Sequence, residues 1–320
     1  MKVTVVVRTY NRPLFLKEAL ASIHLQTHKD WEVLIFDDGG LSETFEIYKD
    51  FKNQNKDKRI LFFSSNEPYY YFKKSWTTAP KLAEGEIMVR LDDDDILEKD
   101  TLEFLSNTYT EHKDLDFSYG STIFFEGDEL KNKVITQTPL EPPKTKDIWE
   151  GYLVGHPWNN PWRFKMNHYK EPKHYTSIIH CSKANIMCIY HTYVMRTSSV
   201  LKVLDKFDVT SNFVDDLEVM GSLDYLGLNH TAIKRTLTYC RIHNNGRVTD
   251  KQNEVEGQTL WNNILWIRDK VDFLRTEGFQ SKIYKPSIDG NNNDPQINSN
   301  HQIYFKDYIQ ELRKTSELFG

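Results

Sequence analysis

Residues 87–95 read Ile-Met-Val-Arg-Leu-Asp-Asp-Asp-Asp, so that a short apolar run ends directly in four acids. Three earlier runs, at residues 3–7, 33–36 and 60–63, are equally short and rich in β-branched or aromatic residues. Apolar runs of this length are typical of strands buried in a sheet. We therefore expect each run to form a strand, with the acids directly after the strand at residues 87–91.

The segment between the first two runs has the pattern of a helix. Pro13 stands where a helix entrance tolerates proline, and the apolar residues behind it recur at the spacing of one helix face. These residues are Leu16, Ala19, Leu20 and Ile23. Strands alternating with helices predict an α/β fold with a mainly parallel central sheet flanked by helices. Ligands of such sheets bind beyond the carboxyl ends of the strands, so the loops after Val7, Phe36 and Leu91 are the expected places for chemistry.

The composition of the 320-residue chain is that of a globular protein, with 39% hydrophobic and 27% charged residues. A net charge of -5 gives no overall attraction to nucleic acid or to anionic membranes. Met1 leads directly into the first run without a signal-peptide pattern, and no apolar stretch reaches about 18 residues. Three cysteines, Cys181, Cys188 and Cys240, are too few and of the wrong parity for a disulfide framework. We therefore expect a cytoplasmic protein.

The regular alternation of strands and helices fades after Glu126. Residues 127–175 contain several prolines and tryptophans, which predicts irregular connections and lobes over a cleft. We expect an α/β half over residues 1–125, a second half over residues 126–250 and a C-terminal helical appendage over residues 251–320.

Further elements are predicted in the second half and near the C-terminus. A strand is expected at residues 188–195, and helices are expected at residues 198–204, 215–226, 260–274 and 305–318. The last helix carries on one stripe Phe305, Tyr308, Ile309 and Leu312. Its charges are mixed in sign, which argues against a membrane anchor and favours packing against the rest of the chain.

The four neighbouring carboxylates repel one another, and each raises the pKa of the next unless a positive group lies among them. A divalent cation would relieve this repulsion. Along an extended chain alternate side chains share a face, so Asp92 and Asp94 can bind one ion while Asp93 and Asp95 point elsewhere. Oxygen ligands suit Mg2+ or Mn2+, which also bind phosphate oxygens. The alternative is a solvated acidic turn that caps a helix beginning near Leu97.

Several segments together resemble family 2 glycosyltransferases of the GT-A (Rossmann-like) fold. The segments lie at residues 5–13 (Val-Val-Val-Arg-Thr-Tyr-Asn-Arg-Pro), 26–39, 83–87 and 91–95, in the family's order and with compatible spacing. The resemblance implies an inverting, metal-dependent enzyme, a hexosyl- or pentosyltransferase that uses Mn2+ or Mg2+. It would move a sugar from a nucleotide sugar, with uridine as the implied nucleoside, to a hydroxyl acceptor. The first half would then bind the donor, and the second half would form an acceptor-side lobe.

The resemblance also implies roles for single residues in the donor site. Tyr10 would stack on the base, Asp38 would hydrogen-bond to it, and Asp92 to Asp94 would hold the ribose and the cation. The full set of expected donor-binding residues is Arg8, Thr9, Tyr10, Arg12, Asp38, Asp92, Asp93 and Arg247. The expected metal ligands are Asp92, Asp94 and His243.

The second half holds the implied catalytic groups. Residues 213–218 resemble the acid pair beneath the acceptor site, which implies Asp216, with Asp215 as its rival, as the general base that takes the acceptor's proton. The late Arg-x-His segment implies that His243 completes the metal site and that Arg247 neutralises the leaving diphosphate. Where the family often carries an Arg-Asn pair, residues 76–77 are Trp-Thr, so the donor's phosphates are expected to rely on other basic groups.

Several alternatives remain open from the sequence. A nucleotidyltransferase on a related sheet would also use paired aspartates and a metal, and an inactive module would bind the nucleotide sugar without turnover. The acceptor is unknown: a glycan is favoured, while the basic, aromatic stretch at residues 163–183 leaves a modified nucleic-acid base as an option. A zinc site is not expected, because the spacing of its potential ligands matches no common zinc motif. These ligands would be His180, Cys181, Cys188 and His191.

Overall fold

A computed structural model of the chain describes residues 1–65, 70–135, 193–206, 229–243, 282–283, 288–289 and 299–320. The helices predicted at residues 215–226 and 260–274 lie outside these described residues, as does most of the strand predicted at residues 188–195. The following elements belong to the described part of the chain.

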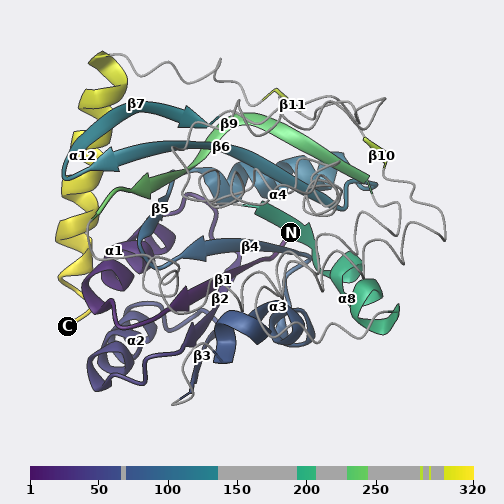
Figure 1. The fold of residues 1–320 in the computed structure, drawn as a ribbon, viewed down its shortest axis with the longest axis horizontal. Helices are drawn as coiled ribbons and strands as arrows, with labels where there is room; N and C mark the ends of the chain where they lie inside the picture. Colours follow the sequence, from purple (N-terminus) through teal and green to yellow (C-terminus); the bar gives the residue numbers. More distant parts are fainter. Residues whose placement is uncertain (66–69, 136–192, 207–228, 244–281, 284–287, 290–298) are drawn as a thin grey trace, which may run out of the picture.

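Four parallel strands form one half of the sheet: β1 (Val3–Thr9), β2 (Trp31–Asp37), β3 (Ile60–Ser64) and β4 (Ile87–Asp92). They lie at the predicted positions, and β1 is the central strand, paired with β2 on one side and β4 on the other. In Figure 1 the arrowheads of β1 and β4 point toward α1 (Pro13–His24), away from the marked N-terminus. The prediction of a mainly parallel sheet with its ligand-binding edge at the strand ends is confirmed for this half.

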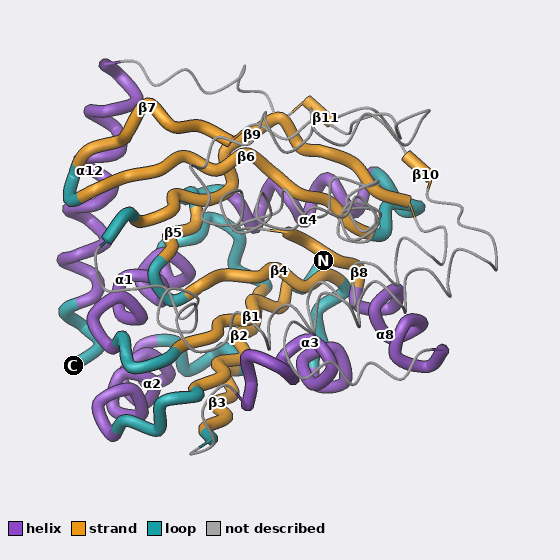
Figure 2. Tube along the Cα trace, in the orientation of Figure 1, coloured by secondary structure: helices purple, strands orange, loops and turns teal. Residues whose placement is uncertain are grey.

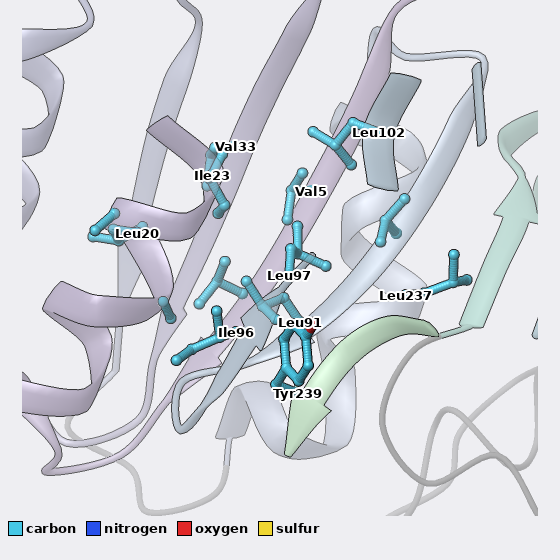
Figure 3. Packing of buried hydrophobic residues seen from close by; sticks show 14 of the residues in the cluster. Val5, Leu20, Ile23, Val33, Leu91, Ile96, Leu97, Leu102, Leu237 and Tyr239 are labelled. Carbon is cyan, nitrogen blue, oxygen red and sulfur yellow. The ribbon is translucent and has the colours of Figure 1, made fainter. Parts of the chain in front are cut away.

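Helices cover both faces of this sheet, because the side chains of each strand alternate between two buried clusters. One cluster includes Val5 of β1 and packs against α1, α2 (Ser42–Gln54) and α4 (Thr101–Glu111). Figure 3 shows Val5 with Leu20 and Ile23 of α1 and Leu102 of α4. The other includes Val6 of β1 and packs against α3 (Tyr70–Leu82) and α8 (Thr197–Lys206). The predicted apolar face of α1 is buried, and the helix predicted at residues 198–204 is confirmed by α8.

The sheet continues beyond β4 with strands of mixed direction. They are β5 (Asp95–Leu97), β6 (Phe117–Glu126), β7 (Glu129–Ile135), β8 (Tyr193–Arg196), β9 (Asn229–Arg241), β10 (Lys282–Ile283) and β11 (Ile288–Asp289). Strand β8 pairs antiparallel with β4 and β6, and β6 pairs parallel with β9. Strand β5 pairs antiparallel with the end of β9, so residues 95–97, which begin with the fourth acid, lie beside residues 238–240. This pairing brings the C-terminal half of the chain to the acids.

Two predicted boundaries are wrong. The helix expected to begin near Leu97 begins at Thr101, since residues 95–97 form β5 and pair with β9. The segment expected to be irregular from residue 127 contains β7, which forms a hairpin with β6. Gly127 in the hairpin turn has a φ of 59°, a left-handed conformation that glycine adopts without steric cost.

The C-terminal helix α12 (Ser299–Ser316) packs on the α/β core, with the predicted stripe buried. Figure 2 shows it running along the side of the molecule that carries α1 and the turn of the β6–β7 hairpin. The expectation of packing within the chain is thus confirmed, while the division of the chain into three parts stays a prediction. Among the described residues, no helix combines the length and apolarity needed to cross a membrane.

Candidate active site

The first part of the site is the loop after β2, which carries Asp38. The Asp37 carboxylate accepts hydrogen bonds from the backbone N–H groups of Gly39, at 2.9 Å, and Gly40, at 3.1 Å, and from the Ser64 hydroxyl, at 3.2 Å. Burial raises the pKa of Asp37, and these hydrogen bonds oppose that shift. Asp38 is buried, and its own N–H donates to the carbonyl of Thr9 at 3.0 Å. Asp37 therefore fixes the loop, and Asp38 lies beside the end of β1.

The turn after β1 approaches the same loop closely. Asn11 has a φ of 53°, which asparagine tolerates better than most side chains. A Cβ atom on Gly39 would lie 2.1 Å from Oδ1 of Asn11 and 2.9 Å from its backbone nitrogen. Only glycine fits at position 39 without displacing this turn. The backbone of the loop after β2 therefore packs directly against Asn11 in the turn after β1.

Asp93 joins the β1 turn to the acidic segment. Its buried carboxylate accepts hydrogen bonds from the Thr9 hydroxyl at 2.9 Å, the Tyr10 N–H at 3.3 Å and the Arg12 guanidinium at 3.2 Å. Burial, and then the neighbouring charge of Asp94, raises the pKa of Asp93 to about 8. Asp93 points into the protein and holds the turn that carries Tyr10, which is half-buried.

Asp94 and His243 meet although they are far apart in the sequence. Oδ2 of Asp94 lies 3.0 Å from Nε2 of His243 and 2.5 Å from Nη1 of Arg12. The His243 ring packs on Phe15 of α1, with ring centroids 4.7 Å apart. The pairing of β5 with β9 brings His243 to this position. The side chains of Asp94 and His243 are 19% and 13% exposed, so the pair is accessible from solvent.

Asp92 has different partners from Asp94. Its carboxylate is bound by the Arg90 guanidinium, with Nη2 2.8 Å from each oxygen, and Arg8 lies 3.8 Å away. The chain turns at residues 93–94, so the alternation that holds along an extended strand does not apply there. In the described part of the chain, no three His, Cys, Asp or Glu side chains form a group able to hold a metal by themselves. The role of Asp92 as a metal ligand therefore stays a prediction.

The pair of Asp94 and His243 nevertheless suits a divalent cation that binds phosphate as well. Oδ2 of Asp94 is an oxygen ligand of the kind that Mg2+ and Mn2+ prefer, and Nε2 of His243, 3.0 Å away, shares with it a hydrogen bond that a bound cation would replace. Mg2+ and ions of similar preference are bound by one or two carboxylates and by substrate phosphates rather than by a complete protein cage. The residues present thus fit a cation that is bound together with a diphosphate.

Arg241 is a residue of the site that the sequence did not single out. Its guanidinium lies between the rings of Phe15 and Phe125, with its central carbon 4.9 Å and 4.6 Å from their centroids. It is paired with Glu18 of α1, and its Nε donates to the backbone carbonyl of Asp94 at 3.3 Å. Arg241 could have been found from the sequence, because it is the arginine of the Arg-x-His segment. Glu18 lies in no motif that would have pointed to it.

The sequence model described as "Glycosyl transferase family 2" matches residues 4–200, more than half of the chain. This match covers the loops after β1, β2 and β4 that build the site. The chain belongs to glycosyltransferase family 2.

Named relatives of this family 2 chain match over shorter segments. An "Uncharacterized glycosyltransferase" of Rickettsia felis is 34% identical over 120 residues, which are 38% of this chain and 19% of that protein. The "GalNAc(5)-diNAcBac-PP-undecaprenol beta-1,3-glucosyltransferase" of Campylobacter jejuni is 32% identical over 96 residues, 30% of each chain. The match thus spans less than a third of the length of either relative.

A solved structure shares the fold. S. aureus TarS 1-349, in complex with UDP-GlcNAc, superposes with a TM-score of 0.53 at 18% sequence identity, covering 87% of this chain and 71% of that one. The GT-A fold expected from the sequence is therefore confirmed for this family 2 chain.

Other predicted site residues lie outside the described part of the chain, and their roles stay predictions. They are Asp215, Asp216 and Arg247, the basic stretch at residues 163–183, and the four potential zinc ligands. Trp76, which replaces the arginine that the family often has, is fully buried beside Tyr193, with ring centroids 5.1 Å apart. Position 76 therefore contributes to the core.

Proposed function

We propose that this chain transfers a sugar from a uridine-linked nucleotide sugar to a hydroxyl group of a glycan, with Mn2+ or Mg2+ bound by Asp94 and His243. One observation carries the proposal: Asp94 and His243 lie 3.0 Å apart at the strand edge where the loop of Asp38 also ends. A diphosphate that shares a cation with this pair would hold its nucleoside near Asp38 and Tyr10. The uridine nucleotide in the TarS complex, on the same fold, supports the choice of nucleoside.

Each described residue has a distinct part in the proposed donor site. Asp38 accepts hydrogen bonds from the base, and Tyr10 stacks on it, in a turn held by the carboxylate of Asp93. Arg12 lies 3.2 Å from Asp93 and 2.5 Å from Asp94, and its positive charge offsets part of the repulsion between these acids before the cation binds. Asp92 faces Arg90 and Arg8, and this arrangement places a carboxylate for the ribose beside two guanidinium groups.

The proposed reaction is a single displacement. The acceptor oxygen forms a bond to the anomeric carbon as the bond from that carbon to the diphosphate breaks, and the acceptor's proton passes to Asp216, with Asp215 as the rival base. The cation would supply stabilisation of the negative charge on the departing diphosphate. Arg247 adds positive charge at the same place, and inversion follows from the displacement on the face opposite the leaving group.

The acceptor class is proposed to be a glycan. The name of the Campylobacter jejuni relative describes a glucosyltransferase that acts on a lipid-linked glycan, which supports this class. A nucleic-acid acceptor would need the basic residues at 163–183, so the two classes differ in a testable way.

The test is a panel of nucleotide sugars incubated with the protein and Mn2+, with and without glycan and DNA acceptors. We expect release of UDP that requires Mn2+ and is lost in Asp94→Asn and Asp216→Asn. Asp57→Asn is the matched control, because Asp57 is exposed and pairs with Lys58 on the surface. Pyrophosphate release would instead identify a nucleotidyltransferase, and nucleotide-sugar binding without release in any mixture would identify an inactive binding module.

A further inference from the structure

Arg241 connects the two candidate metal ligands to the rest of the protein. Arg241 lies two residues before His243 in the sequence. Its guanidinium donates to the carbonyl of Asp94, and its backbone N–H lies 3.4 Å from the carboxylate of Asp95. The guanidinium and the His243 ring both pack on Phe15. Arg241, the last residue of β9, therefore joins the end of this strand to the turn of the acidic segment, and its position determines how these two segments meet.

The side chain of Arg241 is 8% exposed, so its charge needs a partner inside the protein. Glu18 supplies that partner through Oε2, and its side chain is 17% exposed. If Glu18 were neutral, Arg241 would keep its positive charge and would compete with a metal ion for the carboxylates of Asp94 and Asp95. The charge of Glu18 thus keeps Arg241 from adding a second guanidinium, beside that of Arg12, to the carboxylate of Asp94.

The C-terminal helix holds Glu18 from the other side. Nε of Arg313, in the last turn of α12, lies 3.5 Å from Oε1 of Glu18, and Nη1 of Arg313 lies 2.5 Å from Asp128 in the β6–β7 turn. A continuous series of contacts therefore runs from α12 through Glu18 and Arg241 to Asp94. These residues come from α12, α1, β9 and the acidic segment.

We propose that Glu18 is a positioning residue, which acts through Arg241 to hold Asp94 and His243 in place for a divalent cation bound with a nucleoside diphosphate. The series of contacts also makes α12 a support of the donor site, although this helix is distant from it in sequence. The inference rests on the proposed function, because it concerns the same donor site. By this inference, residues beneath the donor site set the affinity of that site for the cation.

The experiment measures binding of UDP, and in parallel of GDP, by calorimetry, first with Mn2+ and then with EDTA. The variants are Glu18→Gln, which removes the charge with little change of shape, and Arg241→Lys, which keeps the charge but loses the planar fork. Glu311→Gln is the matched control, because it makes the same change as Glu18→Gln at a surface residue. Glu311 lies on α12, as Arg313 does, but pairs with Lys99 outside the series of contacts. A Mn2+ titration followed by electron paramagnetic resonance gives a readout that needs no nucleotide.

We expect Glu18→Gln and Arg241→Lys to weaken Mn2+-dependent nucleotide binding about tenfold to a hundredfold, the range for residues that orient metal ligands. In EDTA, Glu18→Gln and Arg241→Lys should bind nucleotide as the unchanged protein does. Glu311→Gln should bind Mn2+ and nucleotide as the unchanged protein does under both conditions. If Glu18→Gln folds and binds Mn2+ and nucleotide as the unchanged protein does, the inference is wrong. If Glu18→Gln fails to fold, Arg241→Lys decides by the same criterion. If the unchanged protein binds neither nucleotide with Mn2+, the proposed function fails and the inference fails with it.

Discussion

The turn after β1, which packs against the loop after β2, and the end of β9 both border the segment of Asp93 and Asp94, but different interactions hold them in place. In the loops, carboxylates bind backbone N–H groups, as Asp37 binds Gly39 and Asp93 binds Tyr10. At the end of β9, a guanidinium is held between two rings and one carboxylate. The first arrangement depends on the path of the chain, and the second depends on side chains supplied by distant elements.

The two kinds of interaction predict different sensitivities to substitution in the two regions. The loops should tolerate most side-chain changes except the loss of Asp37 or Asp93 and the addition of atoms at a close approach, such as at Gly39. A side-chain clamp fails when a single charge or ring is removed. The predictions below test the distinction, beginning where the two regions meet.

Asp94→Asn changes the residue that both regions contact. The amide loses the charge that binds Arg12, His243 and the proposed cation, so we expect Mn2+-dependent transfer to fall about 10²-fold to 10³-fold, as for the loss of one group that stabilises developing charge. Initial rates of UDP release at saturating donor measure the effect. A variant with nearly full activity would show that the cation, if used, is bound elsewhere.

Arg241→Met removes the clamp at the end of β9. The substitution leaves Glu18 largely buried with only part of its compensation from Arg313, so we expect the free energy of unfolding to fall by about 3 kcal/mol. Guanidinium unfolding of the metal-free protein measures this loss. An unchanged midpoint would mean that the rings and backbone, rather than the ion pair, hold this segment.

Gly39→Ala tests the backbone region. Its new Cβ would lie 2.1 Å from Oδ1 of Asn11, so we expect a loss of about 2 kcal/mol, typical of overpacking. The double variant Asn11→Gly with Gly39→Ala should recover part of the loss, since glycine removes Oδ1 and accepts the positive φ. Thermal unfolding of the two variants measures this recovery, and its absence would place the strain outside the contact of these two residues.

Glu311→Gln should have the smallest effect. Its partner Lys99 is on the surface, and pairs of this kind contribute about 0.2–1 kcal/mol. Unfolding in buffers of low and high salt should show a small difference that disappears as salt screens the pair. A loss as large as that of Arg241→Met would mean that α12 is held mainly by its surface charges.

The parallel half of the fold could be predicted from the sequence, because its strands are short apolar runs and the segments between them have helical patterns. The strands beyond β4 were harder to predict: β5 has three residues, and only its pairing with β9 makes it a strand rather than the start of a helix. The hairpin of β6 and β7 was likewise missed, since its signal is a single glycine in a segment that otherwise looked irregular.

In the site, the positions of the acids at the end of β4 and of the loop of Asp38 could be predicted from the sequence, because residues at the end of a strand take their place from the sheet. The sequence also marked His243 through its motif. The separate partners of Asp92 and Asp94 could be seen only in the folded chain, since they depend on a turn at residues 93–94 and on Arg90, Arg8 and Arg12. The folded chain alone revealed Glu18, because a carboxylate on one helix gains its role from a guanidinium that arrives on β9 and a helix that docks from the C-terminus.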